Sequence, residues 1–131
     1  MARWILLIIL MVTLIKVQAT ESAKECKTTK TKIGNGDHLI CSNVTSYFFR
    51  KFDISLNKTY MITCENCTLT TIDENTFPFR NNHVNILYLV KSGIRILKKL
   101  AFARFPSLKI LVLRNNTIDN LDTKTFGSIK N

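Results

Sequence analysis

The chain has 131 residues, which is room for one small domain. Hydrophobic residues make up 46% of it and charged residues 21%, with only 4 Gly and 2 Pro, which excludes a disordered tail and a collagen-like or low-complexity chain. Lys and Arg number 19 against 9 Asp and Glu, a formal charge of +10 that raises the question of a nucleic-acid or anionic-surface partner. The 4 Cys fit a disulfide framework, a zinc site or a redox pair, depending on the compartment.

Residues 1–19 have the pattern of a secretory signal peptide, with Arg3, an apolar run from Trp4 to Ile15 and a small-residue site ending in Ala19. The alternative is an uncleaved membrane anchor, but spanning takes about 20 apolar residues and Lys16 interrupts this run. No second apolar stretch of spanning length follows. The mature chain is therefore expected to be secreted, without a membrane span, into an oxidising compartment.

Asn-x-Ser/Thr acceptor sites for N-glycosylation agree with secretion. Four of them follow the signal segment, at Asn43, Asn57, Asn66 and Asn115. Any one of them is common by chance in a chain rich in Asn and Thr.

A repeat with a period of 24 to 25 residues covers the chain from about residue 59 to 131. The last copy has the pattern L-x-x-L-x-L-x-x-N-x-I-x-x-L followed by a later Phe. Its matching residues are Leu108, Leu111, Leu113, Asn116, Ile118, Leu121, Phe126 and Ile129. The preceding copy fills the same slots by Val84, Leu87, Leu89, Ser92, Ile94, Leu97, Phe102 and Phe105. A first copy matches less completely, by Thr59, Ile62, Cys64, Cys67, Leu69, Ile72 and Phe77.

This pattern resembles the leucine-rich repeat, as found in Toll-like receptor ectodomains and insect leucine-rich repeat immune factors. The resemblance implies an α/β solenoid with parallel strands on a concave face, an irregular or short helical convex side and a Cys-containing N-terminal cap. The expected units are a cap at 20–58, repeats at 59–83, 84–107 and 108–131, and no C-terminal cap. The family recognises proteins or glycans without catalysis, in innate immunity, adhesion and development.

The repeat slots specify local structure. Residues 86–90 and 109–113 are β-branched and aromatic runs that favour strands over the alternative, a pair of amphipathic helices. The spacing of Ile94, Leu97, Leu100 and Ala101 also fits a short helical turn. Asn116 is expected to turn inward and satisfy unpaired backbone groups, with Cys67 and Ser92 as poorer substitutes. Three phenylalanines are expected to stack along the convex side: Phe77, Phe102 and Phe126.

The cap is expected to contain a hairpin, because Cys26 and Cys41 enclose the turn sequence at 34–37. Six residues are expected to cover the first coil: Tyr47, Phe48, Phe49, Phe52, Ile54 and Leu56.

Cys64 and Cys67 fall on inward slots, which weighs against a redox pair, and thiolate–zinc ligation is less expected than disulfides in a secreted domain. We favour Cys26–Cys41 with Cys64–Cys67, and a cross-link from cap to repeat is the rival.

Asn131 stands where a fourth repeat should begin, which leaves an apolar edge at Leu108, Ile118 and Phe126. The sequence therefore suggests the N-terminal part of a longer protein. The alternative is a dimer formed through the last coil.

An apolar concave patch flanked by charge is the expected binding surface for an extracellular protein or glycan. Its outward strand positions are Met61, Thr63, Glu65, Ile86, Tyr88, Val90, Ile110, Val112 and Arg114. Tyr88 and Arg114 are the preferred anchors, because Tyr and Arg dominate interface energetics. The alternative is a face buried by the rest of a longer chain.

Two other functions compete with protein binding. A glycosaminoglycan or anionic membrane surface would use the basic residues Lys24, Lys27, Lys30, Lys32, Lys91, Arg95, Lys98, Lys99, Arg104 and Lys109. A small secreted ribonuclease would use His38 and His83, but no carboxylate motif, nucleophile elbow or phosphate loop accompanies them. We expect no catalysis, no cofactor, no metal and no nucleic-acid partner.

Overall fold

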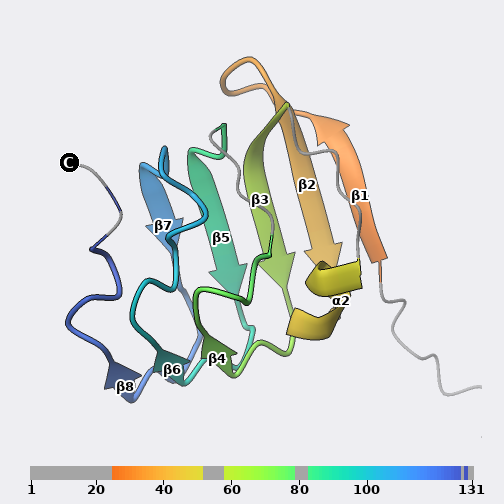
Figure 1. The fold of residues 1–131 in the computed structure, drawn as a ribbon. Coiled ribbons are helices and arrows are strands. Elements are labelled where there is room, and N and C mark those ends of the chain that lie inside the picture. The colour runs from red at the N-terminus through yellow and green to blue at the C-terminus, as the bar shows by residue number, and fades with distance from the viewer. Residues whose placement is uncertain (1–24, 52–57, 79–82, 128, 130–131) are drawn as a thin grey trace, which may run out of the picture.

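The computed structural model describes residues 25–51, 58–78, 83–127 and 129, with the backbone alone at 50 and 51. The expected signal peptide, the acceptor Asn57, Lys24 and the expected cap residues Phe52, Ile54 and Leu56 lie outside the described residues. The described chain is a small β-solenoid of about three turns (Figure 1).

A five-stranded sheet forms one wall of the solenoid, in the order β1 (Glu25–Lys30), β2 (Asp37–Ser42), β3 (Thr59–Glu65), β5 (Ile86–Val90) and β7 (Ile110–Val112). Strand β1 is antiparallel to β2, and every other pair is parallel. A narrow parallel sheet of β4 (Thr71–Ile72), β6 (Ile96–Leu97) and β8 (Asn120–Leu121) forms the opposite wall. Repeated coils thus present the same backbone segment at successive positions, as the period of 24 to 25 residues predicts.

The register of the large sheet follows the repeat slots. Ile62 pairs with Leu87 and Leu87 with Leu111, and Cys64 pairs with Leu89. These side chains point into the space between the two walls because alternate strand residues share a face. Ile62, Cys64, Leu87 and Leu89 are all fully buried, so the repeat pattern identifies the core correctly.

The cap contributes a strand to the coiled sheet, which differs from the expectation that residues 20–58 lack the repeat. Leu39 on β2 pairs with Ile62, and Cys41 pairs with Cys64, so both occupy inward slots. Strands β1 and β2 form the expected hairpin, in which Cys26 lies directly opposite Cys41.

The turn of this hairpin packs closely on the first coil. A Cβ atom on Gly36 would come within 2.5 Å of the Lys58 carbonyl oxygen and 2.7 Å of the Tyr60 Cβ. A glycine is therefore required where the turn crosses the start of β3.

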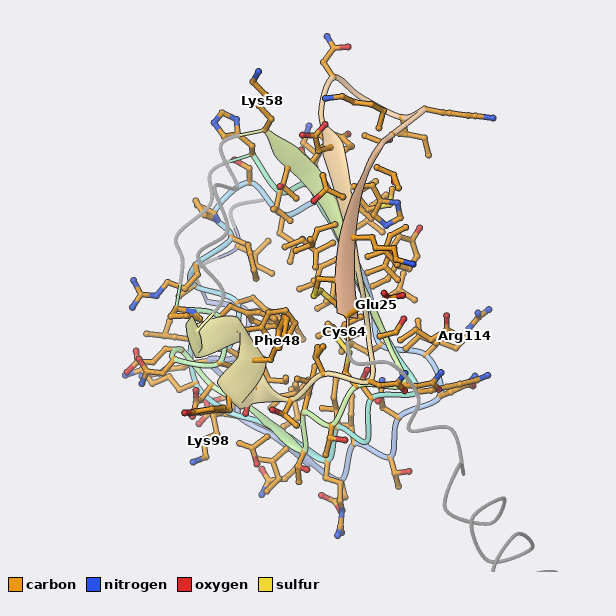
Figure 2. All side chains as sticks on the ribbon, turned by 90° about the vertical axis from the view of Figure 1, so that its right-hand side faces the viewer. Glu25, Phe48, Lys58, Cys64, Lys98 and Arg114 are labelled. Carbon is orange, nitrogen blue, oxygen red and sulfur yellow. A yellow bond between two sulfur atoms is a disulfide. The ribbon has the colours of Figure 1, made fainter. Side chains whose placement is uncertain are left out.

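Aromatic side chains fill the solenoid between the walls (Figure 2). The short helix α2 (Ser46–Lys51) buries Phe49, whose ring lies 5.2 Å from that of Phe77, and Phe77 lies 5.3 Å from Phe105. Phe102 stacks on Phe126 at 5.9 Å. Phe77 thus packs on Phe49 and Phe105, and of the expected row of Phe77, Phe102 and Phe126 the ring contacts give the pair Phe102–Phe126. Tyr47, expected to cover the first coil, is 59% exposed.

The expected helical component of an α/β solenoid is not found in the coils. Within the described ranges the single helix is α2, and the wall opposite the large sheet consists of two-residue strands and turns. Ile96 and Leu97 form strand β6, and Leu100 has a φ of 57°, which interrupts a right-handed helix. The spacing from Ile94 to Ala101 therefore does not produce a helical turn, and this wall has the irregular form of the expected convex side.

Candidate functional site

Outward side chains of the large sheet form three rows across the strands. The first row is His38, Met61, Ile86 and Ile110, and the second is Ile40, Thr63, Tyr88 and Val112. The third contains Ser42, Glu65 and Val90, and Arg114 follows two residues after β7. The nine predicted binding positions therefore lie on one face of the sheet, to which β2 adds His38, Ile40 and Ser42.

Three of these nine residues are much less accessible than expected. Met61 is 8%, Ile86 5% and Val90 7% exposed, whereas Ile110 at the edge is 47% exposed. Neighbouring strands lie about 4.8 Å apart, so side chains on both sides cover a central residue. Met61, Ile86 and Val90 form the floor of the surface rather than its contact groups.

A hollow of about 320 Å³ opens on this face. It is lined by His38, Met61, Thr63, Glu65, Tyr88, Val90 and Arg114. Six of the seven lining residues are predicted binding positions, including both preferred anchors. Arg114 extends from this face in Figure 2, while Cys64 lies inside. The hollow combines an apolar floor with a carboxylate, a phenol and a guanidinium group at its walls.

His38 is the one lining residue outside the nine predicted binding positions. The ribonuclease alternative would pair it with His83, but it lies on β2 with its Nε2 atom 2.8 Å from the Thr63 hydroxyl oxygen. Burial lowers the pKa of His38 from its ordinary value of 6.5, because desolvation disfavours the charged imidazolium. His38 therefore presents a neutral ring to the hollow at neutral pH. The alternation of Asp37–Ser42 was the signal that could have placed it on this face.

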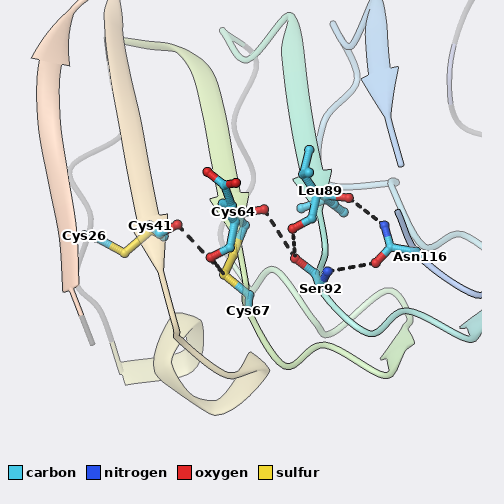
Figure 3. The surroundings of a disulfide bond; sticks show 9 residues. Cys26, Cys41, Cys64, Cys67, Leu89, Ser92 and Asn116 are labelled. Atoms are coloured by element: carbon cyan, nitrogen blue, oxygen red, sulfur yellow. Dashed lines mark hydrogen bonds between the residues drawn. A yellow bond between two sulfur atoms is a disulfide. The ribbon is translucent and has the colours of Figure 1, made fainter. Parts of the chain in front are cut away.

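The repeat slot of Cys67, Ser92 and Asn116, which lies just beyond the strands, is stabilised in a different way in each coil (Figure 3). Asn116 accepts hydrogen bonds at Oδ1 from the backbone N–H groups of Ser92 (2.9 Å) and Ile94 (3.2 Å). Its Nδ2 group donates to the carbonyl oxygens of Leu89 (2.7 Å) and Leu113 (3.0 Å). The predicted inward amide is thus confirmed, and it fixes the strand end beside Arg114.

The other two coils use weaker or different groups in this slot. The Ser92 hydroxyl donates to the carbonyl oxygens of Val90 (3.0 Å) and Cys64 (3.3 Å). Cys67 Sγ lies 4.0 Å from the Cys41 carbonyl oxygen, and as a disulfide sulfur it has no proton to donate. In the first coil the Cys64–Cys67 disulfide therefore takes the place of the hydrogen bonds made by Ser92 and Asn116 in the later coils.

The four cysteines form the two disulfides that the sequence favoured, Cys26–Cys41 and Cys64–Cys67 (Figure 3). Cys64 and Cys67 are buried, which leaves no exposed thiolate for redox chemistry. The described ranges contain no group of three or more His, Cys, Asp or Glu side chains placed to hold a metal ion. Two disulfides fit an oxidising, extracellular environment.

Five of the basic residues that a glycosaminoglycan or anionic surface would use lie beside acidic side chains. Lys27 and Lys30 form ion pairs with Glu25 and Asp37 on the hairpin, and Arg95 pairs with Asp119. Lys98 and Lys99 line a depression together with acidic side chains, those of Asp73 and Glu74. These acidic neighbours lower the positive potential around the five residues.

Comparison of the chain with protein-family models, curated proteins and solved structures found no match. In the part of the chain that the structure describes, no helix has the length and apolar character needed to cross a membrane.

Proposed function

We propose that the chain is a secreted leucine-rich repeat module that binds an extracellular protein through the concave face of its sheet, without catalysis. The repeat slots support the family assignment, since the L-x-x-L-x-L-x-x-N pattern coincides with strands in parallel register. The setting proposed from the resemblance is recognition in innate immunity or adhesion.

The hollow of about 320 Å³ is the observation that carries this proposal. Its floor is apolar at Met61 and Val90, and its polar groups are Glu65, Tyr88 and Arg114. Protein interfaces commonly combine an apolar centre with Tyr and Arg anchors and a polar rim. A side chain inserted from a partner would bury apolar area and meet charged groups of both signs at the walls.

The test is a binding screen with the full chain, expressed through a eukaryotic secretory pathway and displayed bivalently. Purified extracellular proteins and heparin are the probes. We expect a protein hit whose binding is lost in Tyr88→Ala, and kept in Lys99→Ala on the opposite wall. Binding to heparin alone, or a hit that Lys99→Ala abolishes and Tyr88→Ala leaves intact, would contradict the proposal.

A further inference from the structure

A left-handed residue follows each of the four parallel strands of the large sheet. The φ angles are 58° at Asn43, 55° at Asn66, 50° at Lys91 and 58° at Asn115. Such angles are uncommon for residues other than glycine, and asparagine tolerates them best. These four residues therefore occupy equivalent positions in successive coils, and three of them are acceptors of Asn-x-Thr sequences.

Backbone hydrogen bonds hold this row in place along one edge of the sheet. The N–H group of Asn43 donates to the Glu65 carbonyl oxygen (3.3 Å), and that of Asn66 donates to the Val90 carbonyl oxygen (3.1 Å). Lys91 continues the series by donating to the Arg114 carbonyl oxygen at 3.1 Å. The row thus follows the C-terminal ends of the strands.

The turn explains the asparagines, but it does not explain the threonines. Thr45, Thr68 and Thr117 stand two residues after the three asparagines and are exposed. In the coil that has Lys91, the same position is Gly93, so the backbone turn forms without a threonine. A hydroxyl two residues after asparagine is what N-glycosylation requires. Wherever the row has asparagine, the acceptor sequence is complete.

Accessibility agrees with modification at these positions. Asn66 and Asn115 are exposed and Asn43 is half-buried. The two disulfides fit the oxidising compartment in which N-glycans are attached.

We propose that Asn43, Asn66 and Asn115 carry N-glycans that form one row along the C-terminal edge of the large sheet, interrupted at Lys91. In each transfer the asparagine amide nitrogen bonds to C1 of a lipid-linked oligosaccharide. The bond from C1 to the diphosphate oxygen breaks, the lipid diphosphate leaves, and the amide nitrogen loses one proton. At about 4.8 Å per strand, Asn43 and Asn66 are direct neighbours, and Asn115 lies about twice that distance beyond Asn66.

This row borders the hollow, because Glu65 and Arg114 directly precede Asn66 and Asn115. Bulky glycans at this border leave the opposite edge, where β2, β3, β5 and β7 begin, as the route to the hollow. This consequence alone rests on the proposed function, since the glycans themselves do not depend on any partner.

The experiment expresses the full chain in a eukaryotic secretory pathway and removes N-glycans enzymatically in heavy-oxygen water, which labels each former acceptor as aspartate. Peptide mass spectrometry is expected to find label at Asn43, Asn66 and Asn115. Absence of label at any one of the three overturns the proposed row. The binding screen above is unaffected by that outcome, so the two proposals fail separately.

A second variant tests the position rather than the sequence. Lys91→Asn together with Gly93→Ser completes an acceptor sequence at the gap in the row. A Cβ on Gly93 would meet nothing within 4 Å, so the substitution causes no clash, but the φ of 61° at this position adds backbone strain that the Gly93→Ser single variant controls. We expect one additional glycan by intact mass in this variant and none in the matched Lys91→Asn single variant. A secreted double variant of unmodified mass would contradict the accessibility of this edge.

Discussion

At its N-terminal end the solenoid is continued by the antiparallel strand β1 and filled by Phe49 of α2, whereas Ile118, Leu121 and Phe126 of the last coil face solvent. Leu108, also expected at this apolar edge, is instead buried. Phe49 is fully buried, and so are Leu97 and Phe102, whereas Leu121 and Phe126 in the same two slots of the last coil are 54% and 42% exposed. A groove of about 460 Å³ lies along this last coil, lined by Leu111, Leu113, Phe126 and Ile129. Equivalent slots thus differ in burial according to what covers them, because one coil cannot bury its own apolar side.

The strongest way to test this comparison is to truncate one phenylalanine at each end. We expect Phe49→Ala to lower the free energy of unfolding by about 3–5 kcal/mol, the usual cost of a buried aromatic cavity. Phe126→Ala should cost about 1–2 kcal/mol, from partial burial and the stacking on Phe102. Urea unfolding of both variants measures the difference, and equal losses would contradict the account of the two ends.

The two disulfides should also contribute unequally. Cys26–Cys41 closes a sequence separation of 15, so its removal as Cys26→Ala with Cys41→Ala is expected to cost about 3 kcal/mol. Cys64–Cys67 has a separation of 3, and chain entropy predicts about 2 kcal/mol for its removal. Urea midpoints of the two double variants test this order. The opposite order would mean that the Cys26–Cys41 disulfide of the cap contributes less to the free energy of unfolding than the Cys64–Cys67 disulfide of the first coil.

Ser92 in the second coil and Asn116 in the third occupy the same repeat slot, so their contributions to stability can be compared directly. Asn116→Ala leaves the N–H groups of Ser92 and Ile94 without their acceptor and is expected to cost about 1–3 kcal/mol. Ser92→Ala removes one hydroxyl donor and should cost about 1 kcal/mol. Thermal unfolding of both variants distinguishes them. A larger loss in Ser92→Ala would contradict the role assigned to the amide.

A smaller effect is expected from His38. Its folded-state pKa is lowered by burial, so the unfolded chain binds more protons just below the ordinary value of 6.5. The contribution to stability is fully present above that value and is lost as the pH falls toward the folded-state pKa. Unfolding measured at about pH 7.5 and about pH 5.5 should show a smaller difference in His38→Gln than in the wild type. An unchanged difference would mean that His38 is not desolvated on the outward face of the large sheet.

The coils were more predictable from sequence than either the cap or the details of the surface. Leu87 and Leu89 are matched by Leu111 and Leu113 at the same spacing in the next copy. The repeat therefore identifies the inward positions without knowledge of the fold. The sequence did not reveal that β2 belongs to the coiled sheet. Its segment has Val44 in the slot of Asn116 and too few other matching residues to show the period. The burial of Ile86 could not be predicted locally, because it depends on the strands on either side.

The residues of the hollow also divide into those that the sequence predicts and one that it does not. Its six predicted residues follow from strand alternation, whereas His38 enters it through the pairing of β2 with β3, which no local pattern specifies. The repeat spacing already places Asn66 and Asn115 in one slot, whereas Asn43 joins them through the pairing of β2 with β3 and its own left-handed conformation.

The most direct test of the concave-face proposal is the equilibrium dissociation constant of the protein found in the binding screen for two matched double variants. Tyr88→Ala with Arg114→Ala removes both anchors of the hollow, and Lys98→Ala with Lys99→Ala removes two exposed side chains from the opposite wall. We expect the first pair to weaken binding by about 30-fold or more, corresponding to a loss of at least about 2 kcal/mol at an interface anchor. The second pair should bind as the wild type does. Wild-type affinity in the first pair, or a comparable loss in the second, would contradict recognition through the concave face.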